Sequence, residues 1–441
     1  MVIQNKKVNE ILDFVKKGLN EKKPFKKFNA ESGKIIEWGD SFEDVGDYIP
    51  FFIYYKEKDF VKNHLEFIFK YLKKKNYIHL NKSMRFPARF FARPYSQTDF
   101  IFGLILSSKY HKDCITIAQK MLNKSYDLFF KKNFNLLVLE KFPYTSIKIP
   151  KFLRIKIPIT SSDDVGMYIE LFSMIYEKNR NKENIKKAKN IYLKLKNTRE
   201  FNQYGFFPYY TCNHYFFKHV VKRTKYFSKR FDEFKLLKEN SNTMFGLFKL
   251  LELVEGKERS ELKKEIKNIL DTWLKNYFDK EKNIFYTNFD HKSNRKGSDI
   301  TCFHIIELLI LASEKFKERT YLKYAEKIAD TFVKHQNEKT GLIPFLNPEL
   351  KNHELKRFQI EKDESWLDAT LDFSIALLKL HVKTNKQKYL KSARSIKKGI
   401  LKYHKKKHGF AATVKVNDGK TVDPIYSIKM TALILKIFIA L

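Results

Sequence analysis

The sequence predicts an all-α fold built from paired helices, and three observations support this class. Residues 321–341 align without a gap with residues 389–409, which is an internal repeat with an offset of 68 positions. The matching residues are Tyr321, Leu322, Lys323, Ala325, Ile328 and Gly341 in the first copy and Tyr389, Leu390, Lys391, Ala393, Ile396 and Gly409 in the second. Helices of two kinds alternate along the chain, and acidic residues or asparagines begin one kind. A helical pair cannot bury its apolar face alone, so repeated pairs are expected to stack.

The first kind of helix has a lysine-rich polar face and one apolar stripe, which is typical of an outer helix with one face in water. Three such stripes are Phe60, Val61, His64, Leu65, Ile68, Phe69 and Leu72; Ile185, Ala188, Ile191, Tyr192 and Leu195; and Leu262, Ile266, Ile269, Leu270, Trp273 and Tyr277. The second kind is apolar almost all round and is expected to be covered on every side, as an inner helix. It comprises residues 100–106, 165–175, 300–312 and 367–380, among others.

The inner helices share a start signal of acidic and amide side chains. These are Asp44 and Asp47, Asp99, Asp163 and Asp164, Asn242, Asp299, Asp363 with Glu364 and Asp368, and Asp423. Such side chains cap free backbone N–H groups and meet the positive end of the helix dipole, so stability alone explains one of them per helix.

The outer helices end in a second recurrent element. Residues 205–209 read Gly-Phe-Phe-Pro-Tyr and residues 341–345 read Gly-Leu-Ile-Pro-Phe. The glycine predicts a left-handed cap that ends the helix, and the proline prevents the helix from resuming. The chain is then expected to cross to the next inner helix through a short extended loop.

The order of the elements predicts a closed ring in one domain. Seven inner and seven outer segments can be counted if the N-terminal helix, residues 8–19, pairs with the last inner helix, residues 426–441. The longest irregular stretches, residues 141–160 and 201–239, are rich in aromatic residues and predict ordered loops or short strands rather than hinges. A single domain over residues 1–441 is therefore expected.

Composition indicates a folded, strongly basic protein. The 87 Lys and Arg exceed the 50 Asp and Glu by 37, which raises affinity for polyanions in general, although solvated lysines on helix faces account for most of such an excess. Cys114, Cys212 and Cys302 have no paired spacing, so neither disulfides nor a zinc site is indicated and a reducing cytoplasm fits. No signal-peptide core and no apolar stretch of membrane-spanning length is found; residues 430–441 are too short and contain Lys436.

This arrangement resembles the (α/α) toroids of the six-hairpin glycosidase-like superfamily, which also includes sugar epimerases and polysaccharide lyases with similar barrels. The resemblance extends from about Asp40 to Leu441 and implies an (α/α) toroid of six to seven helical hairpins. In that superfamily the substrate cleft lies where the inner helices begin. The resemblance would therefore place Asp44, Asp47, Asp99, Asp164, Asp299, Asp368 and Asp423 around one mouth.

Glycoside hydrolysis needs two carboxyl groups, separated by about 5–5.5 Å for retention or about 6.5–9.5 Å for inversion. Two acidic clusters stand beside tryptophans: residues 40–47 beside Trp38, and residues 363–372 beside Trp366. Glu364, Asp368 and Asp372 are spaced to share a helical face, where like charges disfavour full ionisation, the condition for a general acid. The catalytic candidates are Asp44, Asp47, Asp99, Asp164, Asp299, Glu364 and Asp368.

The binding candidates are aromatic, basic and polar residues near the same helix starts. Trp38 and Trp366 offer flat faces for a sugar ring, or belong to the core. Arg85, Arg89 and Arg93 precede Asp99, and arginine grips carboxylate, sulfate or phosphate bidentately, although these arginines could instead pair with the Asp residues. Tyr95, Tyr209, His214, Asp423 and Tyr426 complete the set. His304 is expected to be a core histidine.

These patterns favour a carbohydrate-active enzyme, most of all a glycoside hydrolase acting on an oligosaccharide or polysaccharide, with the arginines favouring an acidic one. A uronate lyase or epimerase would use His214, Tyr209 and Arg89. A non-catalytic helical-repeat scaffold that binds a polyanion or a protein is the other alternative. No metal-ligand spacing, phosphate loop, dinucleotide fingerprint or nucleic-acid recognition motif is present, so no metal, cofactor or specific nucleic-acid site is expected. The oligomeric state is not predicted.

Overall fold

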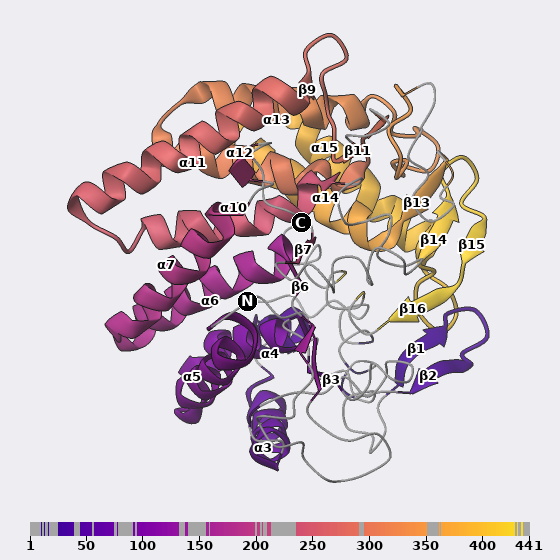
Figure 1. Cartoon of the computed structure of the whole chain (residues 1–441). Coiled ribbons are helices and arrows are strands. Elements are labelled where there is room, and N and C mark those ends of the chain that lie inside the picture. The colour runs from indigo at the N-terminus through magenta and orange to yellow at the C-terminus, as the bar shows by residue number, and fades with distance from the viewer. Residues whose placement is uncertain are drawn as a thin grey trace. The chain divides into compact units, whose positions relative to one another are not determined.

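Helices of the two predicted kinds alternate along the chain in the computed structural model (Figure 1). The structure describes residues 25–38, 45–54, 57–74, 91–92, 95–131, 137–139, 156–157, 159–198, 201–202, 210–212, 235–290, 295–350 and 363–427, with the single residues 10, 13, 16, 77, 205, 361, 430 and 434. The expected pairing of residues 8–19 with residues 426–441 falls almost wholly outside this part of the chain. Two units can be distinguished: Met1–Lys26, Glu37–Asp232 and Asn242–Ile266 form the first, and Lys27–Ile36, Glu233–Ser241 and Lys267–Leu441 form the second.

The first unit contains three successive hairpins. They are α2 (Val45–Tyr54) with α3 (Lys58–Lys74), α4 (Tyr95–Leu106) with α5 (Asp113–Ser125), and α6 (Ser162–Asn179) with α7 (Lys182–Lys196). Within each hairpin the two helices contact each other, and the first helices also contact in succession, α2 with α4 and α4 with α6. The inner helix α4 is thus covered by α2, α5 and α6, as its all-round apolar sequence predicts.

The second unit repeats this pattern. A 3-10 turn (Ile300–Cys302) leads into α12 (Phe303–Phe316), which pairs with α13 (Arg319–Val333), and α14 (Leu367–Thr384) pairs with α15 (Gln387–Gly399). The inner helices α12 and α14 contact each other. Another hairpin, α10 (Leu237–Leu251) and α11 (Gly256–Tyr277), is divided between the two units.

The predicted outer stripes are buried. Val61, Leu65, Ile68 and Leu72 of α3 are fully covered, as are Ala188, Ile191 and Leu195 of α7. The internal repeat has the same explanation: Tyr321, Ala325 and Ile328 of α13 and Tyr389, Ala393 and Ile396 of α15 are the buried positions of two equivalent outer helices. The repeated residues therefore form the face with which the two outer helices pack.

Two glycines allow α6 and α10 to approach closely. A Cβ atom on Gly166 would lie 2.2 Å from the backbone nitrogen of Thr243, and one on Gly246 would lie 2.6 Å from the carbonyl oxygen of Gly166. Real Cβ atoms do not come this close to backbone atoms. Only glycine fits at this crossing.

The crossing loops form small antiparallel sheets. In the first unit, β3 (Phe91–Ala92), β4 (Leu137–Leu139) and β5 (Lys156–Ile157) form one sheet, and β6 (Ile159–Ser161) pairs with β7 (Tyr210–Cys212). The aromatic-rich stretches at 141–160 and 201–239 thus contain short strands, as predicted. Gly205 and Gly341 both have positive φ, +70° and +72°, as predicted, but the prediction that they cap the outer helices is wrong. Helix α7 ends at Lys196 and α13 at Val333, so the two glycines lie in the crossing loops, where glycine adopts the left-handed conformation readily.

Four further sheets belong wholly or mainly to the second unit. Their strand orders are β13 (Glu364–Trp366), β14 (Thr413–Lys415) and β15 (Thr421–Asp423); β12 (Arg295–Gly297), β11 (Asn288–Asp290) and β8 (Lys235–Leu236); β9 (Phe278–Asp279) with β10 (Ile284–Phe285); and β16 (Ile425–Ser427), β1 (Phe25–Asn29) and β2 (Ile35–Trp38). The β13 strand directly precedes inner helix α14. Among the described helices, none combines the length and the apolar character needed to cross a membrane.

Candidate functional site

Buried polar side chains gather where the inner helices begin. They are Gln97 and Thr98 in α4, Asp164 in α6, Asn240, Ser241 and Thr243 in α10, Ser298 and Asp299 before α12, and Glu364, Ser365 and Thr370 around the start of α14. Further along, the same helices are mainly apolar, although Ser173 in α6 and Ser374 in α14 are also buried. Burying a polar group costs free energy unless it is hydrogen-bonded, so this concentration marks the beginnings of the inner helices as the polar ends of the core.

The beginnings of α12 and α14 are joined through one backbone residue. Ile300 N–H donates to the carbonyl of Phe345 at 2.8 Å, and Phe345 N–H donates to the carbonyl of Glu364 at 2.6 Å. Asp299 also forms a β-bridge with Leu346. The predicted acids Asp299 and Glu364 therefore lie on neighbouring extended segments.

Asp299 caps a helix, and both of its carboxylate oxygens accept hydrogen bonds. It is 2% exposed, its Oδ1 accepts from Thr301 N–H at 3.0 Å and from the Thr301 hydroxyl, and its Oδ2 accepts from Asn288 Nδ2 at 3.0 Å. The capping expectation is confirmed. Burial, and next the charge of Asp299, raises the pKa of the adjacent Cys302 thiol, which keeps that buried side chain neutral.

Two unsatisfied polar atoms lie beside this cap. Asn288 Oδ1 and Ser298 Oγ are buried and have no hydrogen-bond partner among the described residues. Leaving a buried acceptor unpaired costs about 1–3 kcal/mol. Water or a hydroxyl-bearing ligand would satisfy both atoms.

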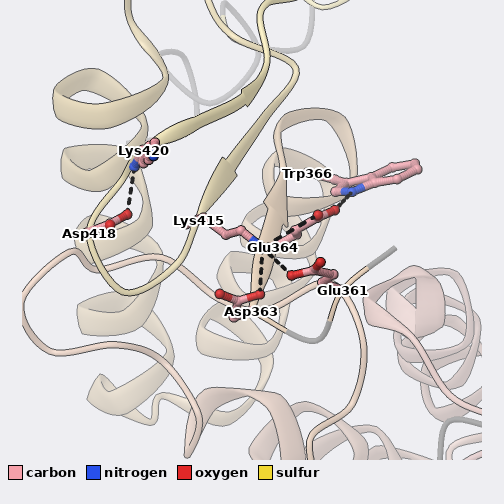
Figure 2. Close-up of polar contacts among 7 residues, drawn as sticks. All are labelled: Glu361, Asp363, Glu364, Trp366, Lys415, Asp418 and Lys420. Carbon is pink, nitrogen blue, oxygen red and sulfur yellow. Dashed lines mark hydrogen bonds and ion pairs between the residues drawn. The ribbon is translucent and has the colours of Figure 1, made fainter. Parts of the chain in front are cut away.

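Glu364 has a different environment, shown in Figure 2. It is 7% exposed, its Oε2 lies 3.4 Å from the indole Nε1 of Trp366, and its Oε1 lies 3.9 Å from Lys415 Nζ. Both contacts are long. The carboxylate therefore keeps acceptor capacity for a further donor, in contrast to Asp299.

Lys415 holds the acidic cluster together. It lies directly opposite Glu364 in the β13–β14 register, donates to Asp363 Oδ1 at 3.1 Å and pairs with Glu361 (Figure 2). The hydrogen bond that Lys415 donates to Glu361, with further contributions from Asp363, raises the pKa of Lys415 to about 12. The cluster thus contains a permanent cation.

The predicted helical face of Glu364, Asp368 and Asp372 is wrong. Glu364 lies in β13, and α14 begins only at Leu367, because the backbone of residues 364–366 pairs with β14 instead of continuing the helix. Glu364 is buried, whereas Asp368 is exposed and its Oδ1 accepts from the neighbouring Ala369 N–H. Asp368 and Asp372 are both in α14, but Glu364 does not share their helical face.

Trp366 is half-buried beside Glu364. Its ring centroid lies 4.6 Å from that of Phe345 with an interplanar angle of 32°, so Phe345 supports one part of the ring while the rest is partly exposed. This geometry suits a stacking platform. Tyr426, by contrast, is 1% exposed and packs against Phe28 and Phe410, a position in the core.

The other described candidates are distributed among separate elements. Asp423 ends β15, and its Oδ1 accepts from Ile425 N–H at 2.9 Å, which is a local turn contact. Asp99 is half-buried at the fifth position of α4, and Asp164 is buried at the third position of α6. The charge of Asp164 is a minor cause of the raised pKa of Tyr168, after burial.

The remaining candidates lie outside the described residues, wholly or by their side chains. The candidates that lie wholly outside the described residues are Asp44, Arg85, Arg89, Arg93, Tyr209 and His214. For Trp38 in β2, Asp47 in α2 and Tyr95 at the beginning of α4, the backbone alone is described. Their roles stay predictions.

Sequence reasoning missed Lys415, Asn288 and Phe345. Lys415 is one of many lysines, and only the register of β13 with β14 brings it to Glu364. Asn288 reaches Asp299 from a strand eleven residues upstream. Both contacts depend on strands of three residues, which are too short to show periodicity in the sequence. Within the described residues, no group of three or more His, Cys, Asp or Glu is placed to hold a metal ion.

Solved structures similar to this chain share its fold over nearly all of its length. The α-1,2-mannosidase from Trichoderma reesei matches with a TM-score of 0.67 at 12% identity, over 98% of this chain and 91% of that one. D-mannose isomerase matches with a TM-score of 0.58 at 9% identity, over 98% and 96%. Cellobiose 2-epimerase from Bacillus thermoamylovorans matches with a TM-score of 0.56 at 13% identity, over 99% and 100%.

These are six-hairpin glycosidase-like toroid proteins, so the likeness confirms the all-α (α/α)-toroid fold that the sequence predicts. No protein-family model and no curated protein matches the sequence. At these identities the likeness shows the fold alone.

Proposed function

We propose that this (α/α)-toroid protein is a carbohydrate-active enzyme of the glycoside hydrolase type, acting on an oligosaccharide or polysaccharide. The observation that carries the proposal is the buried carboxylate of Glu364, which lies between Trp366 and Lys415 at the start of inner helix α14. The structural neighbours described above are a mannosidase, a mannose isomerase and a cellobiose epimerase, and their sugar substrates support the substrate class.

Glu364 is suited to accept a proton. Hydrolysis of a glycosidic bond requires a carboxylate that activates water or attacks the sugar, and a second carboxyl that protonates the leaving oxygen. The Trp366 N–H and the Lys415 ammonium orient the Glu364 carboxylate without saturating it. Water or a sugar hydroxyl can therefore donate to its remaining lone pairs.

Trp366 and the Asp299 region have supporting roles in this proposal. The Trp366 ring, supported by Phe345, is the platform on which a sugar ring stacks. Asp299 uses both oxygens in capping and in holding Asn288, so it acts as a positioning residue.

The test is turnover of a saccharide panel by matched carboxylate variants. The panel contains α-1,2-linked mannose oligosaccharides, β-linked glucose oligosaccharides and uronate-containing glycans, with new reducing ends as the readout of hydrolysis. Glu364→Gln should lower turnover at least about 100-fold, because the amide cannot exchange a proton. Glu361→Gln is the control, since it removes another carboxylate partner of Lys415 that is exposed.

Three results would contradict the proposal in different ways. Equal activity of Glu364→Gln and wild type would remove Glu364 from the chemistry. Altered sugars without new reducing ends would replace hydrolysis with epimerisation or isomerisation. Absence of turnover and of binding for every saccharide would favour the scaffold alternative.

A further inference from the structure

The chain contains a long segment without acidic residues. No Asp or Glu lies between Asp372 and Asp418, although Lys and Arg recur throughout this segment. The first part of the segment is neutralised by neighbouring elements: Lys379 pairs with Glu307, Lys386 with Glu326 and Lys388 with Asp330. Further along α15, Lys391, Arg394 and Lys398 have no ion pair within the part of the chain that the structure describes.

Four exposed cations form one row along α15 and the π-helical turn that continues it (Ile400–His404). They are Lys391, Arg394, Lys398 and Lys402, spaced three or four residues apart, which places them on one helical face about 5–6 Å from each other. None of the four has an ion pair among the described residues. The row extends over about 16 Å at 1.5 Å per residue.

The loop after the helix continues the positive charge. Lys405, Lys407 and His408 are exposed, and Lys406 is half-buried. Among the described residues, two acids lie near this loop: Asp418 in the turn whose Gly419 packs on Tyr403, and Glu31, whose neighbour Ala30 accepts from His408 N–H. Asp418 accepts from the backbone of Lys420, and Glu31 accepts from Thr421. Neither acid is paired with the four cations of the row, so no described carboxylate neutralises them.

We propose that this basic row, residues 391–402, binds a linear anionic polysaccharide outside the catalytic site, an inference that rests on the proposed function for the kind of polymer. Regularly spaced lysines on an exposed helix match a chain with one carboxylate or sulfate per repeating unit. No large apolar side chain is exposed between residues 387 and 408, where lipid insertion or base stacking would need one. The charge pattern therefore fits a polyanionic glycan better than a membrane or single-stranded RNA.

The experiment compares two fourfold variants that change the net charge equally. The first replaces Lys391, Arg394, Lys398 and Lys402 with Gln. The control replaces Lys62, Lys70, Lys73 and Lys74 of α3 with Gln, which are also exposed and have no ion pair within the described residues. Binding of polygalacturonate, of poly(U) RNA and of phosphatidylserine vesicles is measured at low and at physiological salt.

The row variant should bind polygalacturonate about tenfold more weakly than wild type, with a smaller salt dependence, while the α3 variant keeps wild-type affinity. Equal losses in both variants would show non-specific attraction by net charge and overturn the proposal. Tighter row-dependent binding of poly(U) or vesicles than of polygalacturonate would overturn it too. Turnover of short neutral oligosaccharides should be unchanged in the row variant. This measurement tests the proposed enzymatic activity separately from polysaccharide binding by the row.

Discussion

Two acids that the sequence treats as equivalent have different roles because their partners differ. Both Asp299 and Glu364 stand at the beginning of an inner helix, which is all that spacing can predict. Asp299 accepts N–H and O–H donors at both oxygens, whereas α14 has no side-chain cap and Glu364 keeps free acceptor capacity. The distinction arises from Thr301 and Asn288 in one case and from Lys415 in the other. Two of these partners, Asn288 in β11 and Lys415 in β14, lie in strands of three residues.

Asp299→Asn tests the capping role at the residue scale. Asparagine caps helices about as well as aspartate, so the variant should fold with a loss of less than about 1 kcal/mol and should retain most of its turnover. Asp299→Ala should lose about 1–2 kcal/mol, since it removes the cap and the partner of Asn288. Urea unfolding and turnover are the measurements. A turnover loss in Asp299→Asn as large as that of Glu364→Gln would make Asp299 catalytic.

Trp366 is the second residue whose role can be separated from folding. Trp366→Phe retains a ring over Phe345 but loses the indole N–H to Glu364, whereas Trp366→Ala loses both. If the ring binds a sugar, KM should rise about fivefold in Trp366→Ala and less in Trp366→Phe, because aromatic stacking contributes about 1 kcal/mol. Equal KM values in wild type and Trp366→Ala would exclude stacking. Thermal unfolding of both variants controls for loss of structure.

At the scale of the elements, periodicity predicts the helices well and the sheets poorly. An outer helix of four turns or more repeats its apolar stripe several times, so the faces of α3, α7 and α11 could be read directly. Strands such as β13 and β14 have three residues each, fewer than two periods of side-chain alternation. The assignment of Glu364 to a helix was wrong for this reason.

The crossing of α6 and α10 provides a prediction at this scale. Replacing a helical glycine with alanine normally stabilises by about 1 kcal/mol. At Gly166 the new Cβ would lie 2.2 Å from the Thr243 backbone nitrogen, and backbone cannot move aside cheaply, so Gly166→Ala should instead destabilise by about 2–3 kcal/mol. The midpoint of urea unfolding measures the change.

Gly256→Ala is the matched control for that crossing. Its Cβ would meet no atom within 4 Å, but its φ of +56° disfavours alanine, so a loss of about 1 kcal/mol is expected from the backbone alone. A smaller loss at Gly166 than at Gly256 would show that the two helices separate without cost.

At the scale of the whole molecule, the basic composition supports both cohesion and binding. Lysines connect successive inner helices, as in the pair of Lys249 with Glu177 at 2.7 Å and that of Lys379 with Glu307 at 2.7 Å. The sequence predicted solvated lysines on helix faces, but which acids they meet depends on helix order in space. The prediction of a single domain stays a prediction.

The stability of the whole molecule should fall on mild acidification. Burial lowers the pKa of His64 and of His404 to about 4, from 6.5 in the unfolded chain. Between these values the unfolded chain binds protons that the folded chain does not, so stability is complete above pH 6.5 and is lost as the pH falls toward 4. Each histidine contributes a loss of about 2 kcal/mol between pH 7 and pH 5.

His64→Phe tests how much the protonation of His64 alone contributes to this pH dependence. The ring of His64 stacks on Phe60 with centroids 5.5 Å apart, so phenylalanine preserves the aromatic contact and cannot be protonated. The loss of unfolding free energy from pH 7 to pH 5 should therefore be about 2 kcal/mol smaller in this variant than in wild type, whatever its stability at pH 7. Urea unfolding at the two pH values measures this difference. An identical pH dependence in His64→Phe and wild type would mean that His64 is protonated in the folded protein as readily as in the unfolded chain.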